Sequence, residues 1–280
     1  MLTKGRTLKK SKYQNFTLIG GIEGLGFMKQ IPNIFTLLNL FFGCLAIVYT
    51  LQNGMASASN ENGELLLMLP EKIYMASVFI GMAAIIDFLD GFVARIVKAS
   101  SEMGKQLDSL ADVVSFGVAP GLIVYQFLRL AFAQQENGLN TSAAWLLPAF
   151  IIPCAGAYRL ARFNIDVEES IGFKGVPIPA IGLLITSFPL IYWYSNNPFA
   201  VRLLLNQWFW YGIIAVTSCL MISTLPMLAL KFKDASIKNN LPKVILLVVA
   251  ILSAIFFKWL AVPVVFLVYV VLSLITNHRT

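Results

Sequence analysis

Residues 73–132 read IYMASVFIGMAAIIDFLDGFVARIVKASSEMGKQLDSLADVVSFGVAPGLIVYQFLRLAF, two long apolar runs separated by a short basic connection. Each run exceeds the roughly 20 residues that an α-helix needs to cross the hydrocarbon core of a bilayer. Four aspartates nevertheless lie within them: Asp87, Asp90, Asp108 and Asp112. A carboxylate near the centre of a membrane helix costs about 2.5–3.5 kcal/mol. The stretch therefore predicts two membrane helices whose acidic side chains serve a function.

The composition of the whole chain agrees with this interpretation. Of its 280 residues, 58% are apolar and only 12% are charged, about half the charged share of an ordinary globular protein. This excludes a soluble enzyme with a single anchor and leaves no room for a separate soluble domain of useful size.

Apolar runs recur along the chain at residues 31–51, 73–97, 107–132, 142–163, 178–195, 207–231, 241–257 and 259–277. The last two runs are separated only by Lys258, Trp259 and Pro263. We expect a tight helical hairpin there, because one continuous helix would be nearly twice the roughly 30 Å thickness of the hydrocarbon core. The predicted fold is an all-α polytopic membrane protein with about eight transmembrane helices.

Lys and Arg residues alternate strongly between the two sides of this predicted topology. Seventeen lie on the side of the N-terminus and four on the opposite side. Basic loops face the cytoplasm, so we expect an integral protein of the cytoplasmic (inner) membrane with both termini and the active site on the cytoplasmic side. The basic residues 1–30 would form a cytoplasmic or interfacial segment. The net charge of +7 then needs no nucleic-acid partner.

Histidine and cysteine chemistry is excluded by the sequence. The only histidine is His278, and Cys44, Cys154 and Cys219 lie in separate apolar runs without a common spacing. A Ser-His-Asp triad, a His-zinc site and a disulfide framework therefore lack the residues they require. Catalysis must rely on carboxylates, hydroxyls and basic side chains.

The four aspartates form two pairs with helical spacing. Spacings of three and four residues place Asp87 with Asp90, and Asp108 with Asp112, on one face of a helix each. The connection between Arg95 and Lys105 returns the chain, so the two faces can meet near the cytoplasmic boundary. Carboxylates this close repel unless cations neutralise them. Their hard oxygen ligands indicate magnesium, manganese or calcium; the alternative is that they merely cap helices or reach toward the interface.

Small and basic residues follow the first aspartate pair. Gly91 and Ala94 leave a smooth groove where a bulky ligand could approach the backbone, although small residues also serve helix packing in membranes. Arg95 and Lys98 lie next to this groove and suit phosphate. A divalent-metal site beside basic residues indicates a pyrophosphate ligand.

Together these residues give Asp87-x-x-Asp90-Gly91-x-x-Ala94-Arg95, then Gly104, Asp108 and Asp112. The pattern resembles the signature of the CDP-alcohol phosphotransferase family. That resemblance implies a six-helix catalytic core, here within residues 31–232 and followed by a C-terminal helix pair within 233–280. It also implies a homodimer and two divalent ions, Mg²⁺ or Mn²⁺, held by the four aspartates.

The resemblance further implies roles for individual side chains. Gly91, Arg95 and Ser101 would contact the CDP moiety. Ala94, Asn33 and Thr36 are further candidates for binding CDP-diacylglycerol, by their position in the predicted helices. Asp112 would also act as the catalytic base toward the acceptor hydroxyl, although nearby cations make any carboxylate a weak base.

Within the family, residues 32–40, 115–120, 159–164 and 175–180 are similar to the branch that transfers a phosphatidyl group from CDP-diacylglycerol to L-serine and releases CMP. Glycerol 3-phosphate, an inositol phosphate or an amino alcohol are alternative acceptors. A cation-coupled transporter is the alternative from another class, because intramembrane carboxylates also mark ion paths.

Several candidates have an ordinary structural alternative. Lys98, Arg159, Arg162 and Lys174 could bind the acceptor or a phosphate, or could simply follow the charge rule for cytoplasmic loops. Asn33, Thr36 and Asn39 share one helix face and could contact ligand or a neighbouring helix. The aromatic residues around 192–194 and 208–211 are typical of an interfacial belt.

Overall fold

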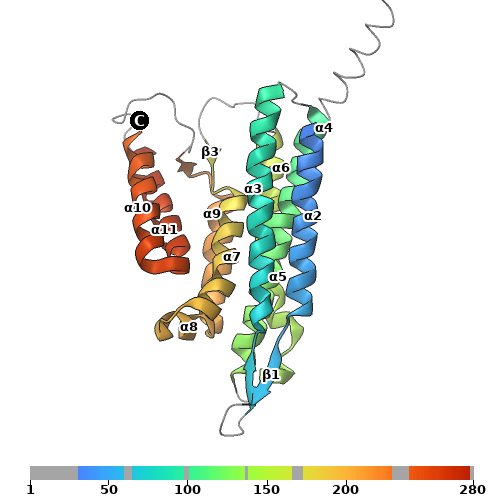
Figure 1. The fold of residues 1–280 in the computed structure, drawn as a ribbon, viewed down its shortest axis with the longest axis vertical. Coiled ribbons are helices and arrows are strands. Elements are labelled where there is room, and N and C mark those ends of the chain that lie inside the picture. The colour runs from blue at the N-terminus through green and yellow to red at the C-terminus, as the bar shows by residue number, and fades with distance from the viewer. Residues whose placement is uncertain are drawn as a thin grey trace, which may run out of the picture.

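A computed structural model describes residues 31–59, 65–97, 101–135, 138–165, 173–228 and 240–277. The N-terminal segment 1–30, Lys98 and the expected boundary at 232 lie outside the described residues. The described chain forms a helical bundle in which α2, α3 and α5 run side by side (Figure 1). The predicted all-α polytopic class is thereby confirmed.

The first half of the bundle contains α2 (Ile31–Gln52), α3 (Tyr74–Val97), α4 (Glu102–Asp112), α5 (Ala119–Ala133) and α6 (Ile151–Ile165). The second half contains α7 (Ile178–Tyr194), α8 (Pro198–Leu204), α9 (Gln207–Ile222), α10 (Leu241–Phe257) and α11 (Ala261–Asn277). Short 3₁₀ turns cover Glu71–Ile73, Gly138–Asn140, Ala143–Trp145, Leu147–Phe150 and Lys258–Leu260, and a π-helical segment, η2, covers Val113–Val118.

Two small antiparallel strand pairs lie outside the helices of the bundle. β1 (Ala56–Ser59) pairs with β2 (Leu65–Met68), with Ala56 opposite Met68. β3 (Phe173–Lys174) pairs with β4 (Pro226–Met227), which joins the segment before α7 to the segment after α9. These pairs were not predicted, because strands of two to four residues leave little periodic signal.

Every predicted apolar run contains a helix, but fewer helices than expected reach full spanning length. Five helical stretches are long and apolar enough to cross a membrane: Pro32–Gln52, Glu71–Ile96, Glu102–Ala133, Ala143–Ile165 and Leu241–Thr276. A sixth is present if α8 and α9, which meet at 75°, count as one. The expected run 207–231 is shorter as a helix because α9 ends at Ile222 and the chain then enters β4.

The last stretch folds back on itself as predicted. α10 ends at Phe257. The next residue, Lys258, has a φ of 51°, in the left-handed region, and begins a short 3₁₀ turn that leads into α11. The two helices then pack along each other (Figure 1). The C-terminal residues thus form a helical hairpin beside the main bundle.

Between α5, α7 and α9 the core is aromatic. The rings of Phe127 and Trp210 stack with centroids 4.9 Å apart, and Phe188 meets Trp210 edge-on at 5.2 Å. Trp210 is 0% exposed, and its indole N–H donates to the carbonyl of Leu204 at 2.8 Å. The expected interfacial role of this tryptophan is therefore wrong, because the bend between α8 and α9 turns it inward.

Helix α4, the π-helical segment η2 and helix α5 follow one another without a break and form one helical stretch. In a regular α-helix the N–H of residue 120 would donate to the carbonyl of residue 116, but Pro120 has no N–H. The wider π turns occur immediately before this proline. Such segments are frequent at functional sites, and this one begins directly after Asp112.

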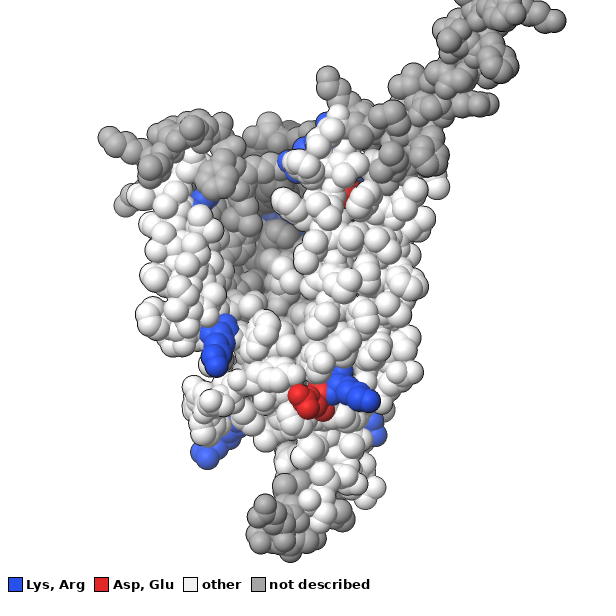
Figure 2. All heavy atoms as spheres, in the orientation of Figure 1, with Lys and Arg blue, Asp and Glu red and all other residues white. Residues whose placement is uncertain are grey.

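The surface fits a membrane protein. Figure 2 shows a lateral surface almost free of charge, with Lys and Arg gathered toward the two ends of the molecule. Many large apolar side chains are exposed on α2, α3, α10 and α11. Together with the long apolar helices, this surface identifies an integral membrane protein.

Candidate active site

Three carboxylates converge where α3 and α4 face each other. Asp87 of α3 and Asp108 and Asp112 of α4 each place a carboxylate oxygen within 4.8 Å of the others. Asp87 lies ten residues before the end of α3, and Asp112 lies ten residues after the start of α4. Both are therefore about 15 Å along their helices from that end. The prediction that the two acidic faces meet is confirmed.

The fourth aspartate lies beside this cluster. Asp90 is 9% exposed and accepts a short hydrogen bond from the hydroxyl of Thr36 on α2. Its charge still interacts with those of Asp87 and Asp108. The structure thus holds Asp90 against α2 and leaves the other three carboxylates closest together.

The polar face of α2 supports the cluster at a second point. The amide of Asn39 donates to Asp112 at 3.4 Å, and the hydroxyl of Ser115 donates to the carbonyl of Asn39 at 3.0 Å. Asp112 is 6% exposed. Helix α2 has no acidic residue, yet its side chains orient the carboxylates of Asp90 on α3 and Asp112 on α4.

Gly43 allows this close approach of α2 to η2. A Cβ atom at this position would lie 2.3 Å from Oγ and 2.9 Å from Cα of Ser115. Sequence reasoning missed both Gly43 and Ser115 as contributors to the site. The sequence held one indication of Gly43: it follows Asn39 by four residues and so lies on the same face of α2 as the polar side chains.

Exposed residues follow the two aspartates on α3. Gly91 is exposed, and beyond the backbone of α3 itself no atom of the described residues lies within 4 Å of where its Cβ would be. Arg95, one turn later, is also exposed, and its Nε donates to the carbonyl of Gly91 at 2.8 Å. Ala94 is half-buried. The structure thus presents Gly91 and Arg95 to a ligand.

The start of α4 gathers further predicted residues. Ser101 caps the helix, because its hydroxyl accepts a hydrogen bond from the N–H of Gly104 at 2.9 Å. A Cβ on Gly104 would lie 3.1 Å from the side-chain oxygen of Asn33. Ser101 and Asn33 therefore both lie against the first turn of α4.

Two arginines one helical turn apart have different environments. Arg159 is 5% exposed, its Nε has no hydrogen-bond partner among the described residues, and its charge interacts with that of Asp112. The guanidinium of Arg162 instead donates to the carbonyls of Ile222 and Ser223, at 2.8 and 3.0 Å. Arg162 thus caps the end of α9, whereas Arg159 is buried and leaves its Nε free of a hydrogen bond within the described part of the chain. Lys174 is exposed on β3.

The donor set fits a divalent cation. The ligand atoms are carboxylate oxygens of Asp87, Asp108 and Asp112, which are hard donors suited to magnesium, manganese or calcium. No Lys or Arg of the described residues forms an ion pair with them, so a divalent cation could relieve their mutual repulsion.

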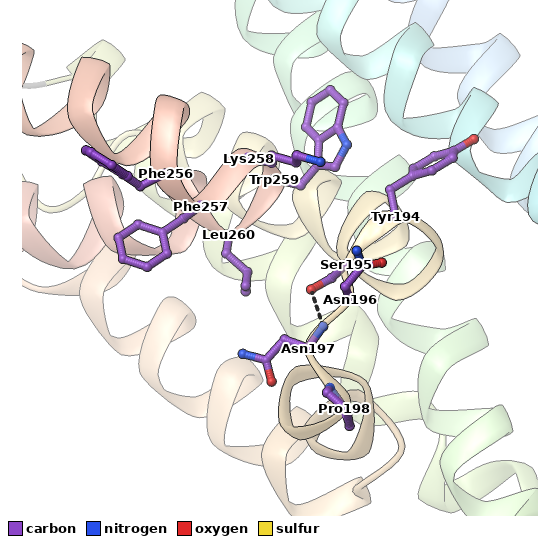
Figure 3. A pocket seen from close by; sticks show the side chains of 10 residues that line it. All are labelled: Tyr194, Ser195, Asn196, Asn197, Pro198, Phe256, Phe257, Lys258, Trp259 and Leu260. Atoms are coloured by element: carbon purple, nitrogen blue, oxygen red, sulfur yellow. Dashed lines mark hydrogen bonds between the residues drawn. The ribbon is translucent and has the colours of Figure 1, made fainter.

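A separate pocket lies at the other end of the bundle. It has a volume of about 470 Å³ and lies between the segment joining α7 to α8 and the turn joining α10 to α11 (Figure 3). Among the described residues that line it, only Lys258 is charged, and the N–H of Asn197 donates to Ser195 Oγ at 3.2 Å. Because no described residue of this lining is acidic, the acidic cluster is the better candidate for the reaction centre.

Comparisons with known proteins agree with the geometry. Residues 29–209 match the model of the CDP-alcohol phosphatidyltransferase family. A CDP-diacylglycerol–serine O-phosphatidyltransferase of Helicobacter pylori is 33% identical over 229 residues, 81% of each chain. One of Methanocaldococcus jannaschii is 36% identical over 214 residues, 71% of this chain and 87% of the relative.

An archaetidylserine synthase of Methanothermobacter thermautotrophicus is 35% identical over 144 residues, 51% of this chain and 58% of the relative. The family match covers more than half of the chain and includes α3, α4 and the whole acidic cluster. The chain belongs to the CDP-alcohol phosphatidyltransferase family.

Proposed function

We propose that this protein transfers a phosphatidyl group from CDP-diacylglycerol to the hydroxyl of L-serine, giving phosphatidylserine and CMP. The observation that carries the proposal is the convergence of Asp87, Asp108 and Asp112 within 4.8 Å. The names of the similar proteins support serine as the acceptor, because they share serine while the donor lipid differs between them. Family membership also argues against a cation-coupled transporter.

The four aspartates would hold two divalent ions, Mg²⁺ or Mn²⁺. When bound, the ions would neutralise the donor pyrophosphate and stabilise negative charge that develops on its oxygens. Thr36 keeps the Asp90 carboxylate oriented through its hydroxyl. Asp87 and Asp108 would bind the ions, and Asp112 would bind an ion and also meet the acceptor hydroxyl.

The donor would lie along α3. The bare backbone at Gly91 and the small side chain of Ala94 leave room for the cytidine moiety, and Arg95 offers an exposed guanidinium to phosphate. Ser101 and Asn33, which lie against the start of α4, would contact the same ligand. The lipid chains could then enter sideways from the bilayer.

Asp112 would orient the serine hydroxyl and accept its proton. The serine oxygen forms a bond to the phosphorus that carries the lipid, the bond from this phosphorus to the bridging oxygen breaks, and CMP leaves. The hydrogen bond from Asn39 holds the Asp112 carboxylate in place for this step. A positioned carboxylate base contributes on the order of 10²–10⁴ in rate.

Arg159 is the best-placed acceptor residue. Its side chain is buried, its Nε has no hydrogen-bond partner among the described residues, and its charge attracts that of Asp112, so it could receive the carboxylate of serine. Arg162 already bonds two backbone carbonyls at the end of α9, which favours a structural role. Lys174 and Lys98 are secondary candidates for lipid phosphate.

The protein would lie in the inner membrane, with the proposed site facing the cytoplasm. The 17 to 4 division of Lys and Arg supports this orientation. Residues 31–232 would form the catalytic core and 233–280 the appended helix pair. The family resemblance also favours a homodimer, which the mass of the purified protein in detergent would test.

The proposal is tested by an acceptor panel. Purified protein is given CDP-diacylglycerol, Mg²⁺ or Mn²⁺, and in turn L-serine, glycerol 3-phosphate, an inositol phosphate and ethanolamine. CMP release and the lipid product are measured, with Asp108→Asn as the inactive control. We expect phosphatidylserine from serine and a water-level background otherwise. Turnover with another acceptor and none with serine would refute the assignment, and retention of activity in a chelator would refute the metals.

A further inference from the structure

The pocket of about 470 Å³ lies where the C-terminal helix pair meets the main bundle (Figure 3). One wall is the turn Lys258–Leu260 between α10 and α11, and the other is the segment 194–198 between α7 and α8. The turn also packs against α7. The helix pair lies outside residues 29–209, the part that matches the family. An appended element therefore supplies half of this pocket.

The pocket lies at the end of the bundle opposite the acidic cluster. Tyr194, which lines it, donates its hydroxyl to Glu71 at 3.1 Å, and Glu71 lies just before the start of α3 at Tyr74. Asp87 lies 13 residues beyond Tyr74, about 20 Å along the helix. Tyr194 and Trp259 are 41% and 44% exposed, as aromatic side chains at a membrane interface often are. The pocket is therefore near the membrane surface opposite the proposed active site.

The pocket offers hydrogen-bond donors and one positive charge, that of Lys258. The Oδ1 of Asn197 already accepts the backbone N–H groups of Phe199 and Ala200, at 3.0 and 3.4 Å. This leaves the amide nitrogen of Asn197 as the group that can bind a ligand. The Oγ of Ser195 accepts the N–H of Asn197 and keeps its own proton to donate. An ammonium, an amide and a hydroxyl fit a phosphate, whose oxygens accept hydrogen bonds from all three.

A lysine occupies a backbone position that suits glycine better. Lys258 has a φ of 51° and a ψ of −121°, and it is the only non-glycine residue with a positive φ in the described part of the chain. A side chain strains the backbone in this region, and glycine does not. Strain of this kind is often found where a side chain serves a ligand. The ammonium of Lys258 is therefore a candidate for a binding role.

Apolar side chains adjoin these donors. Phe256 and Phe257 also line the pocket, and they are 74% and 55% exposed at the end of α10. Figure 3 shows them on the opposite side of the turn from Lys258 and Trp259. Exposed phenyl rings on a membrane helix contact acyl chains, whereas a free phosphate would use only the polar side. The combination fits a molecule with a phosphate head and a hydrocarbon tail.

We propose that this pocket binds an anionic phospholipid from the leaflet opposite the proposed active site. Lys258, Asn197 and Ser195 surround its phosphate, and its acyl chains lie along Phe256 and Phe257. Because the phosphate contacts both walls, the lipid ties the C-terminal helix pair to the segment between α7 and α8. The inference is independent of the acceptor and of the reaction.

The test measures lipid binding to the full chain in detergent by native mass spectrometry. Dioleoyl phosphatidylglycerol is the anionic probe and dioleoyl phosphatidylcholine the zwitterionic one, and a chelator is present so that no metal holds lipid phosphate at the acidic cluster. We expect phosphatidylglycerol to bind about tenfold more tightly than phosphatidylcholine. Lys258→Gln should weaken phosphatidylglycerol binding about tenfold, the scale of one lost hydrogen bond to a charged group. Lys72→Gln, which removes a positive charge from the same end of the bundle outside the pocket, should leave it unchanged.

Lys258→Gly separates lipid binding from folding. Glycine relieves the positive φ, so the lipid-free variant should melt about 2 °C above the lipid-free wild type. Phosphatidylglycerol at a hundredfold excess over its Kd should raise the melting temperature of the wild type by about 5 °C and that of Lys258→Gly much less. Equal binding of the two lipids, equal affinities in Lys258→Gln and Lys72→Gln, or a full lipid shift in Lys258→Gly would overturn the inference. An equal shift with inorganic phosphate would show a site for free anions and refute the lipid.

Discussion

Gly43→Ala should uncouple α2 from the reaction centre. The added Cβ would lie 2.3 Å from Oγ and 2.9 Å from Cα of Ser115. The hydroxyl can rotate away, but Cα is backbone and cannot. To restore ordinary contact, α2 must move away from η2 by about 0.5–1 Å, because carbon atoms rest about 3.5–4 Å apart.

Two opposing effects determine how much Gly43→Ala changes the stability of the protein. Overpacking of a well-packed contact costs about 1–3 kcal/mol, and replacing glycine by alanine within a helix returns about 0.5–1 kcal/mol. We therefore expect a net loss of stability of about 0.5–2 kcal/mol. The shift also breaks the bond from Asn39 to Asp112, which is already 3.4 Å long, so kcat should fall roughly tenfold, as expected for a displaced catalytic group.

Gly81→Ala and Gly212→Ala are the controls, because no atom lies within 4 Å of the Cβ position at either glycine. The assay combines thermal unfolding in detergent with CMP release in the presence of serine. Gly43→Ala should melt lower than wild type and turn over slowly, while the controls should melt at or above the wild-type temperature with normal activity. If Gly43→Ala behaves like the two controls, the contact with Ser115 does not position the site.

Three further predictions follow from the site and the topology. Asp108→Asn should abolish metal-dependent donor binding, whereas Asp112→Asn should largely keep it and lose roughly 10²-fold in single-turnover CMP release; equal loss of binding in both would make Asp112 chiefly a ligand. Arg162→Gln should lower the melting temperature with little change in the serine KM, whereas Arg159→Gln should raise the serine KM with little change in the melting temperature. The opposite result for the two variants would exchange the roles assigned to these arginines. Cysteines placed at either terminus should resist impermeant labels added to intact cells, and labelling from outside would invert the topology.

The positions of the main helices could be predicted from the sequence because apolar runs of spanning length have few alternatives in a membrane. The meeting of Asp87 with Asp108 and Asp112 was also predictable, since helical spacing fixes the face of each pair and a short connection fixes their antiparallel order. These properties are local. They need only the residues between Asp87 and Asp112.

The contacts that orient the carboxylates were less accessible. Whether Arg159 or Arg162 caps α9 depends on where α9 ends, and the chain leaves α9 there to pair β4 with β3, which lies far away in the sequence. The burial of Trp210 depends likewise on the 75° bend before α9. Long-range packing decides both, and hydrophobic periodicity does not encode it.

The segment Val113–Val118 fixes the rotational phase between the two halves of the helix to which it belongs. Deleting one residue there would permit a regular α-helix of the same apolar character, but would turn the residues before it by about 100° relative to those after it. Asp108 and Asp112 would then point away from Asp87, while Phe127 would remain in the aromatic core. Such a protein would still insert into the membrane and fold, yet have no reaction centre. Changes in chain length should accordingly be tolerated between β1 and β2, which lie at the far end of the bundle (Figure 1), and not between Asp112 and Pro120.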